Sequence, residues 1–249
     1  MSLGISLLGA DADLAAAIDA TDSLAVETTD DPADADQGDR SDRAGLVVTV
    51  GEEPLTDCAA RGEARPILPA GLEADWSPAS EAVPELLAGE SLKALPTVEA
   101  RPLAVSVGND ATTAAFDVTL ITSEPARISE YTVSVGGRPR ATFRADGVVV
   151  ATPLGSSGYA RAAGGPQLAF GTGLAVVPIA PFATIADAWV LRPPLSIRVE
   201  RDDAVDVFAD TDRLIADAAG FTADIEPGPA LSLVDCRNWK NSNESLPQS

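Results

Sequence analysis

The residues best suited to chemistry lie in two short stretches, one rich in hydroxyl groups and one rich in carboxylates. The first, DGVVVATPLGSSGYARAAGGP (146–166), runs from an apolar segment into a turn that carries Ser156, Ser157 and Tyr159. Small residues let a backbone approach a flat ligand closely, and hydroxyls can bind ribose, amide or phosphate groups. The two serine hydroxyls could equally bond to the turn's own backbone, so both interpretations stay open. The second stretch, GEEPL (51–55), follows an apolar run, where open α/β sheets place their ligands.

The charge balance excludes several classes of partner. The 249 residues include 38 Asp and Glu against 17 Lys and Arg, a formal net charge of −21. Phosphate contacts need clustered Lys and Arg, so neither nucleic acid nor an acidic membrane surface is an expected partner. The acids are spread along the chain, which indicates a halophilic protein adapted to a salty cytoplasm, because salt screens such self-repulsion. The alternative, an acidic partner-binding face, would need localised charge.

Several kinds of reaction centre are also excluded. The chain has no histidine, so mechanisms that use a histidine base are ruled out. Cys58 and Cys236 form no CxxC pair and are expected to be free, and no metal site is predicted. No apolar run approaches the roughly 20 residues that span a bilayer, and the N-terminus lacks the basic region of a signal peptide. These patterns favour a cytoplasmic protein.

The elements that position the two stretches change character near residue 95. Before it, apolar runs such as LVVTV (46–50) alternate with helical patterns such as residues 77–90, which predicts a small α/β fold. After it, short runs of alternating Val, Thr and Ile with glycine turns predict strands. The expected organisation is an α/β domain at 1–94, a β-rich domain at 95–237 and a mobile tail at 238–249.

The 146–166 stretch resembles a signature of the NAD kinase family, DG-apolar-STPTGSTAY-x-x-SAGGP. LAVVPIAPF (174–182) is similar to the family's VVTPICPHSL, with Phe182 in place of histidine, and residues 70–90 are similar to its GFLAEV…LEALLAGE. The resemblance implies 2′-phosphorylation of NAD to NADP with ATP or polyphosphate as donor. It also implies a Rossmann-like N-terminal α/β domain, a β-sandwich-like C-terminal domain with NAD in the cleft between them, and a homodimer or homotetramer.

The resemblance also implies a set of ligand-binding residues. The expected ligand is NAD(P), with ATP and Mg²⁺ in addition if the kinase is active. The positions that would bind the dinucleotide are Gly51, Asp117, Asp146, Thr152, Gly155, Ser156, Ser157 and Tyr159.

The expected phosphate loop departs from the family's GGDG. In the simplest register Gly51 matches the first glycine, Glu52 the second, Glu53 the aspartate and Pro54 the last glycine. A register shifted by one would put Glu52 at the aspartate instead. Glu52 adds negative charge where a polyphosphate would approach, and Pro54 removes a backbone donor. Glu53 is the catalytic candidate, although its carboxylate is set one methylene further out.

Two further departures affect the ligand positions. Phe116–Asp117 stands where the family has Asn-Glu or Asn-Asp, and Asp210–Thr211 stands where it has a late DG pair. Together with the altered loop, these changes predict reduced or lost kinase activity. Three functions stay open: an active NAD kinase, a non-catalytic NAD(P)-binding regulator, and a non-catalytic subunit of a kinase oligomer.

Overall fold

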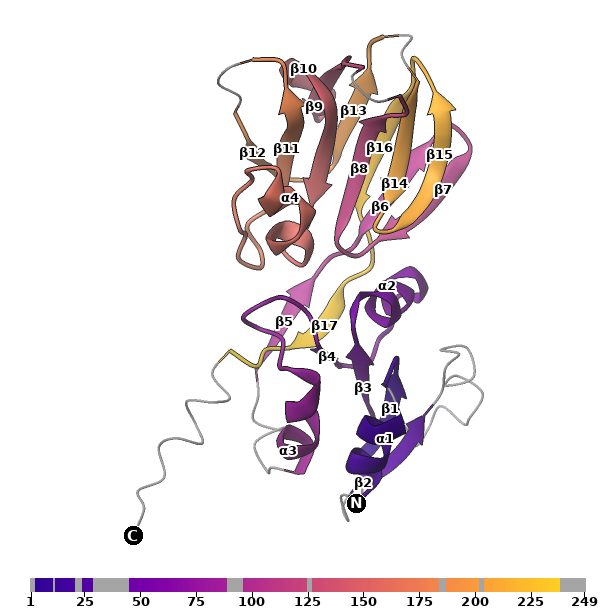
Figure 1. Cartoon of the computed structure of the whole chain (residues 1–249), viewed down its shortest axis with the longest axis vertical. Helices are drawn as coiled ribbons and strands as arrows, with labels where there is room; N and C mark the ends of the chain where they lie inside the picture. The colour runs from indigo at the N-terminus through magenta and orange to yellow at the C-terminus, as the bar shows by residue number, and fades with distance from the viewer. Residues whose placement is uncertain are drawn as a thin grey trace. The chain divides into compact units, whose positions relative to one another are not determined.

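The computed structural model describes residues 3–10, 12–20, 24–28, 45–88, 96–124, 127–183, 187–201 and 204–237. They form two compact units, one of the described residues up to Glu99 together with those from Leu231 to Arg237, and one of those between Ala100 and Ala230. The predicted fold class, an α/β unit followed by a β-rich one, is confirmed (Figure 1). The division differs from the predicted 1–94 and 95–237, because residues 231–234 return to pair with the first sheet. The predicted tail 238–249 lies outside the described residues.

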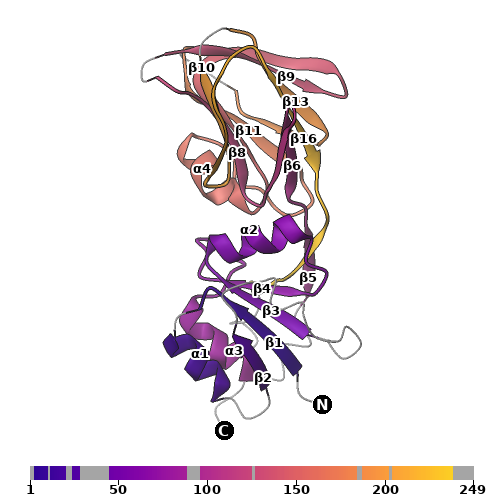
Figure 2. The ribbon, with the colours of Figure 1, turned by 90° about the vertical axis from the view of Figure 1, so that its right-hand side faces the viewer.

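The first unit is built on a sheet with the strand order β2-β1-β3-β4-β17-β5. Strands β2, β1, β3, β4 and β17 run parallel to one another. Helices α1 and α3 cover one face of the sheet and α2 covers the other (Figure 2). The elements are β1 (Leu3–Leu8), α1 (Ala12–Asp19), β2 (Leu24–Thr28), β3 (Gly45–Val50), α2 (Glu52–Arg61), β4 (Ile67–Ala70), the 3-10 turn η2 (Ser80–Ala82), α3 (Val83–Ala88), β5 (Thr97–Ala100) and β17 (Leu231–Val234).

The sequence of strand β3 is apolar along its length because both faces of the strand are covered. Leu46 and Val48 belong to a cluster that includes buried side chains of α1 and α3. Val47 lies between them and is fully buried, so it faces the side that α2 covers, because successive side chains point to opposite faces. A strand covered on both faces has no solvent-facing position for a polar residue.

Two helices differ from the prediction. A loop is expected after β3, but the structure has helix α2 there, so that expectation is wrong. The signals were present: Glu52 and Glu53 in the first turn, Arg61 in the last, and Gly62 at the C-cap with φ 63°. The helix expected at 77–90 is shorter, with a 3-10 turn at Ser80–Ala82 and Pro84 in the first turn of α3.

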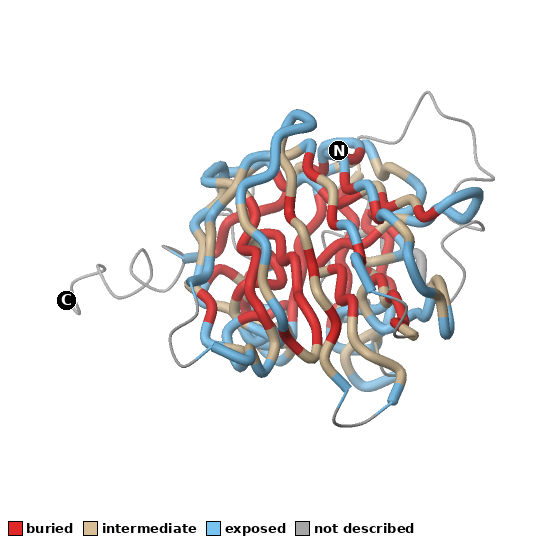
Figure 3. Tube along the Cα trace, turned by 90° about the horizontal axis from the view of Figure 1, so that it is seen from above, coloured by how far each residue is buried: buried red, intermediate tan, exposed pale blue. Residues whose placement is uncertain are grey.

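The second unit is an antiparallel sheet of eleven strands among the described residues. Alternate residues of most strands point into one apolar interior, as Val105, Leu120 and Val133 do. Most buried positions lie in the strands, whereas most residues of the connecting loops are exposed (Figure 3). The elements are β6 (Leu103–Val107), β7 (Asp110–Ala114), β8 (Asp117–Thr122), β9 (Ser129–Val135), β10 (Arg138–Ala151), η4 (Gly155–Ser157), α4 (Tyr159–Ala162), β11 (Leu174–Pro181), β12 (Trp189–Leu191), β13 (Leu195–Val199), β14 (Val205–Ala209), β15 (Asp212–Ala218) and β16 (Thr222–Pro227).

The end of β10 is buried on both faces. Val148 and Val150 point into the main interior of the unit. Val149 and Ala151 pack on the opposite side against Ala160 of α4. The short helix α4 therefore covers the outer face of β10, and the run VVVA carries the chain directly into the turn that follows.

The two cysteines are free, as predicted, and both are buried. Burial raises the pKa of Cys58 and the pKa of Cys236 to about 11. Both thiols are therefore neutral at pH 7, which excludes them as nucleophiles. Within the described residues, no helix is long and apolar enough to cross a membrane.

Asp206 of β14 is a buried carboxylate that bonds to the residue after β8 and to strand β15. It accepts hydrogen bonds from the Ser123 hydroxyl at 2.6 Å and the Asp217 N–H at 2.9 Å, and Arg213 reaches it at 3.3 Å. Burial alone would raise the pKa of this carboxyl, but the three partners outweigh it and hold the pKa below its ordinary value. A depressed pKa means that the ionised form stabilises the fold.

We expect Asp206→Asn to lower the free energy of unfolding at pH 7 by about 1–3 kcal/mol, because a buried network loses its charged acceptor. In the wild type this stabilisation is complete above the unfolded pKa of about 4 and is lost as pH falls through the lower folded pKa. Denaturant unfolding between pH 7 and pH 3 in high salt measures both effects. The difference between the two proteins should shrink on acidification, and a constant difference would contradict the assignment.

Candidate functional site

Thr152 lies at the end of β10 and organises the turn that follows. Its hydroxyl is 2.8 Å from the Ala115 carbonyl oxygen and 3.1 Å from that of Phe116, to which it donates. The same oxygen accepts the N–H groups of Leu154, at 3.2 Å, and Gly155, at 3.3 Å. Thr152 is 1% exposed. A hydroxyl with this many internal partners positions the turn and has no capacity left for a ligand.

Ser156 and Gly155 are also turned inward. The Ser156 hydroxyl donates to the Pro153 carbonyl at 3.0 Å and accepts the Leu168 N–H at 2.9 Å. Gly155 packs against Phe116 so closely that an added Cβ would lie 2.3 Å from the Phe116 carbonyl oxygen. For Ser156 the structure thus favours the interpretation of a side chain that bonds to the backbone of the turn.

Ser157 and Tyr159 face outward from the same turn. Tyr159 is 44% exposed, and Ser157 is half-buried. Within the described residues neither hydroxyl makes a hydrogen bond, so both are available to a ligand. The turn therefore divides its hydroxyls into an inner pair that holds the backbone and an outer pair that faces solvent.

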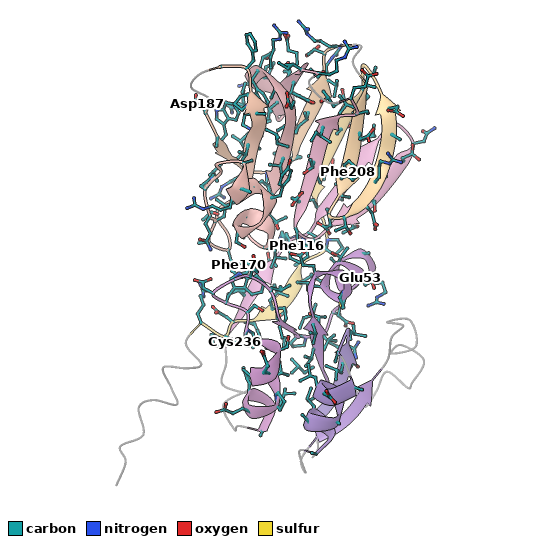
Figure 4. The ribbon with its side chains drawn as sticks, viewed as in Figure 1. Glu53, Phe116, Phe170, Asp187, Phe208 and Cys236 are labelled. Atoms are coloured by element: carbon teal, nitrogen blue, oxygen red, sulfur yellow. The ribbon has the colours of Figure 1, made fainter. Side chains whose placement is uncertain are left out.

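Asp117 begins the neighbouring strand β8 and lies opposite Ala151 in the sheet. Its carboxylate accepts the Thr119 hydroxyl at 3.0 Å. The Thr152 N–H donates to the Phe116 carbonyl at 2.9 Å, so the start of β8 and the turn after β10 are bonded to each other. Phe116 itself is almost fully buried, at 7% exposed, and lies immediately before β8 (Figure 4).

Asp146 does not join this group. It lies within β10, six residues before Thr152, which in an extended strand is about 20 Å. Its backbone carbonyl accepts the Tyr131 hydroxyl at 3.3 Å. The structure of the second unit therefore brings together Asp117, Thr152, Gly155, Ser156, Ser157 and Tyr159, and leaves Asp146 apart.

The first unit places Gly51 and Glu53 at the start of helix α2. Gly51 is the N-cap with φ 86°, a conformation that glycine adopts readily, and its N–H donates to the Ala70 carbonyl at 2.9 Å. Glu52 and Glu53 occupy the first turn, and both are exposed. Figure 4 labels Glu53 on this helix. Carboxylates at this end stabilise a helix through its dipole. The same charges oppose binding of a second anion there.

Pro54 lies in the first turn of α2, which follows a strand at the topological switch point of the sheet. From β1 the chain adds β2 on one side and β3 on the other, and open α/β sheets bind ligands outside the carboxyl ends of such strands. Gly9 follows β1 with φ 74°. A Cβ on Gly9 would lie 2.5 Å from the Pro54 Cγ. The proline ring therefore packs directly on the β1 loop, next to the start of α2.

The carboxylates at the start of α2 define what a metal could find there. Among the described residues there is no group of three or more His, Cys, Asp or Glu that could hold a metal ion. Mg²⁺ in nucleotide sites is commonly held by one or two carboxylates together with substrate phosphates. The pair Glu52 and Glu53 has the donor chemistry for Mg²⁺ that arrives with a nucleotide.

Comparison with known proteins agrees with the arrangement of the second unit. Residues 116–230 match the family model of the ATP-NAD kinase C-terminal domain. This segment resembles the C-terminal domain of the NAD kinase family. The predicted resemblance is confirmed, and the matched segment contains the whole group from Asp117 to Tyr159.

Curated NAD kinases align with part of the chain. The enzyme of Methanosarcina barkeri is 39% identical over 88 residues, which are 35% of this chain and 32% of that protein. The enzyme of Methanopyrus kandleri is 36% identical over 107 residues, 42% of this chain and 39% of that protein. The matched stretches thus span between about a third and two fifths of these relatives.

Two solved structures share the fold over nearly the whole chain. The NAD kinase of Archaeoglobus fulgidus, in complex with ATP, has a TM-score of 0.73 at 20% identity and covers 98% of this chain and 99% of its own. Yeast NADH kinase, in complex with NADH, has a TM-score of 0.72 at 16% identity and covers 98% and 87%. At these identities the likeness establishes the fold alone.

Sequence reasoning missed the function of one residue in the site. The sequence identifies Asp210 only as the first residue of an altered DG pair. In the structure its carboxylate accepts the N–H groups of Ala115, Phe116 and Asp117. The partners lie 93 to 95 residues away, so no local pattern in the sequence reports them.

Proposed function

We propose that the chain is an NAD-kinase-like protein that binds NAD(P), with phosphoryl-transfer activity that is reduced or lost. The contact between Pro54 and Gly9 carries this proposal, since it fills the sheet edge at which a phosphate would otherwise approach α2. A homodimer or homotetramer in the cytoplasm remains part of the proposal.

The dinucleotide side of the proposal rests on the outward face of the 152–159 turn. The Tyr159 ring offers an apolar surface to a base, and its hydroxyl and that of Ser157 offer hydrogen bonds. The Asp117 carboxylate, one strand away, is an acceptor suited to ribose hydroxyls. Small residues between them leave room for close approach of the ligand.

The phosphate side rests on the start of α2. A helix N-terminus is a favourable site for an anion when its N–H groups are free and no negative charge lies nearby. Glu52 and Glu53 place two carboxylates there, and Pro54 has no N–H to donate. A displaced catalytic group costs rate steeply, on the order of 100-fold for about 1 Å, so the longer Glu53 side chain adds to the loss.

An active kinase is the second candidate, because Glu53 keeps an exposed carboxylate at the start of α2. In that case Glu53 would accept the proton of the NAD 2′-hydroxyl as it attacks the terminal phosphorus of the donor, and ADP, or the polyphosphate shortened by one unit, would leave. Phosphoryl transfer depends mainly on positioning and charge neutralisation, which a single carboxylate can assist.

The test combines a binding and a turnover measurement in several molar KCl. We expect calorimetry to detect binding of NAD, NADH or NADP. Tyr159→Ala should weaken it about 5- to 160-fold, because loss of ring stacking on a base costs about 1–3 kcal/mol. Phe182→Ala is the control: Phe182 is 69% exposed but follows β11, where its N–H donates to the Arg144 carbonyl of β10, about 25 Å along that strand from Thr152. It should leave affinity unchanged.

Turnover is measured as NADP formed from NAD with Mg²⁺ and ATP or polyphosphate, beside the Methanosarcina barkeri enzyme. We expect a rate at least about 100-fold lower than that of the relative. A comparable rate that disappears in Glu53→Ala would overturn the proposal in favour of an active kinase. Absence of binding to any dinucleotide, with a stable hetero-oligomer, would instead favour a non-catalytic subunit.

A further inference from the structure

The carboxylate of Asp210 has an unusual set of partners. Its Oδ2 accepts the Ala115 N–H at 2.7 Å, and its Oδ1 accepts the N–H groups of Phe116 at 2.7 Å and Asp117 at 3.0 Å. Three consecutive backbone donors therefore converge on one side chain. Hydrogen bonds to a charged acceptor are roughly twice as strong as neutral ones.

Asp210 lies just beyond the paired part of its strand. The ladder between β14 and β8 ends at Ala209 and Val118, and Asp210 follows with φ 52°. Its N–H donates to the Asp117 carbonyl at 2.8 Å. Aspartate tolerates this left-handed conformation better than most residues, which turns the chain so that its carboxylate reaches back to the start of β8.

The same short segment is held from its other side by Thr152. Asp210 binds the N–H groups of residues 115–117, while the Thr152 hydroxyl and N–H bind the carbonyls of Ala115 and Phe116. Gly155 then packs on the Phe116 carbonyl. A continuous series of contacts thus runs from the end of β14, through the start of β8, to the turn that carries Ser157 and Tyr159.

We propose that Asp210 is a positioning residue for the dinucleotide site: it fixes the backbone that carries Asp117 and, through Phe116 and Thr152, the 152–159 turn. This inference rests on the proposed function for its ligand, and Asp210 itself needs no contact with that ligand. Its effect is to order beforehand two groups that the dinucleotide would otherwise have to order on binding.

Asp206 supplies a matched control. It lies on the same strand β14 and also has three partners: Ser123, Arg213 and the Asp217 N–H. None of these bonds leads to residues 115–117 or to the turn. Both carboxylates stabilise the unit, but only Asp210 is connected to the site.

The first experiment compares Asp210→Asn with Asp206→Asn. Asparagine keeps the size of the side chain and tolerates the backbone conformation, but its NH₂ group would face N–H donors at position 210. Calorimetry in high salt should show that D210N binds NAD, NADH or NADP at least about tenfold more weakly than the wild type. The affinity of D206N should fall by less than about twofold, although the two variants lose similar amounts of Tm. Equal losses of affinity in both variants would overturn the inference.

The second experiment needs no ligand. Hydrogen exchange followed by mass spectrometry should show faster exchange in D210N at residues 115–117 and also at 152–159, whereas D206N should affect peptides around Ser123 and Asp217. Unchanged exchange at 152–159 in D210N would overturn the positioning role. If the wild type binds no dinucleotide, the proposed function fails, and the exchange result still decides whether Asp210 holds the turn.

Asp210→Glu is a second variant that tests the inference if Asp210→Asn does not fold. It keeps the charge and displaces the carboxylate by one methylene, so exchange at 152–159 should lie between those of the wild type and D210N. A glutamate variant with the protection and affinity of the wild type would show that the position of the carboxylate does not matter, which contradicts the inference.

Discussion

Gly155→Ala is expected to destabilise the second unit by about 3 kcal/mol, near the upper end of what an added methyl group costs in a packed interior. The new Cβ would lie 2.3 Å from the carbonyl oxygen of Phe116, 2.5 Å from its carbonyl carbon and 2.9 Å from its Cα. All three are backbone atoms, so no rotation of a flexible side chain can relieve the contact.

The backbone of Phe116 is also poorly able to move. Thr152 bonds to its carbonyl, and Asp210 accepts its N–H at 2.7 Å. A shift large enough to admit the methyl group would break hydrogen bonds on one side or the other, and each buried group left without a partner costs about 1–3 kcal/mol. The substitution should therefore also weaken dinucleotide binding, because it displaces Asp117 and the turn together.

Gly158→Ala provides the control three residues along the same turn. There the added Cβ would lie 3.5 Å from the Gly155 carbonyl oxygen, an ordinary contact, and the residue is exposed. Its free energy of unfolding should change by less than about 1 kcal/mol. Denaturant unfolding in high salt measures both variants. Equal stability of the two would show that the close packing of Gly155 on Phe116 is not present in solution.

The 146–166 stretch shows how far the sequence alone could predict the site. Its apolar run and its glycine-rich turn predict a strand and the place where the strand ends, and the structure has β10 and η4 there. The direction of each hydroxyl could not be predicted. Thr152 is turned inward because its acceptors, Ala115 and Phe116, lie 37 and 36 residues away in the chain and become neighbours only when β8 pairs with β10.

The GEEP stretch at 51–54 shows a different limit. The change from GGDG to GEEP was visible in the sequence, and its chemical consequences followed from charge and from the missing N–H of proline. The close approach of Pro54 to Gly9 could not be predicted, because Gly9 lies on a different strand loop. Local residue types therefore predict which chemical groups are present, whereas tertiary packing decides what lies next to them.

Withdrawal of salt is the other change with a large expected effect. At a net charge of −21 the chain repels itself, and the Debye length of about 30 Å at 0.01 M salt leaves that repulsion largely unscreened. At 1 M the Debye length falls to about 3 Å. We expect transfer from several molar KCl to dilute buffer to remove a stability of the order of 5–15 kcal/mol, so that the cooperative fold is lost. Circular dichroism during stepwise dilution follows the loss.

Variants of the net charge separate screening from other effects of salt. Asp110, Asp224 and Glu226 are exposed and make no ion pair among the described residues. Replacing all three by lysine changes the net charge from −21 to −15, because each exchange removes one negative charge and adds one positive charge. The lysine variant should keep its fold to a lower KCl concentration than the wild type, and a variant with asparagine and glutamine at these positions should lie between them. If all three proteins unfold at the same concentration, or none unfolds in dilute buffer, the acids do not reflect adaptation to salt, and a localised acidic binding face becomes the better explanation.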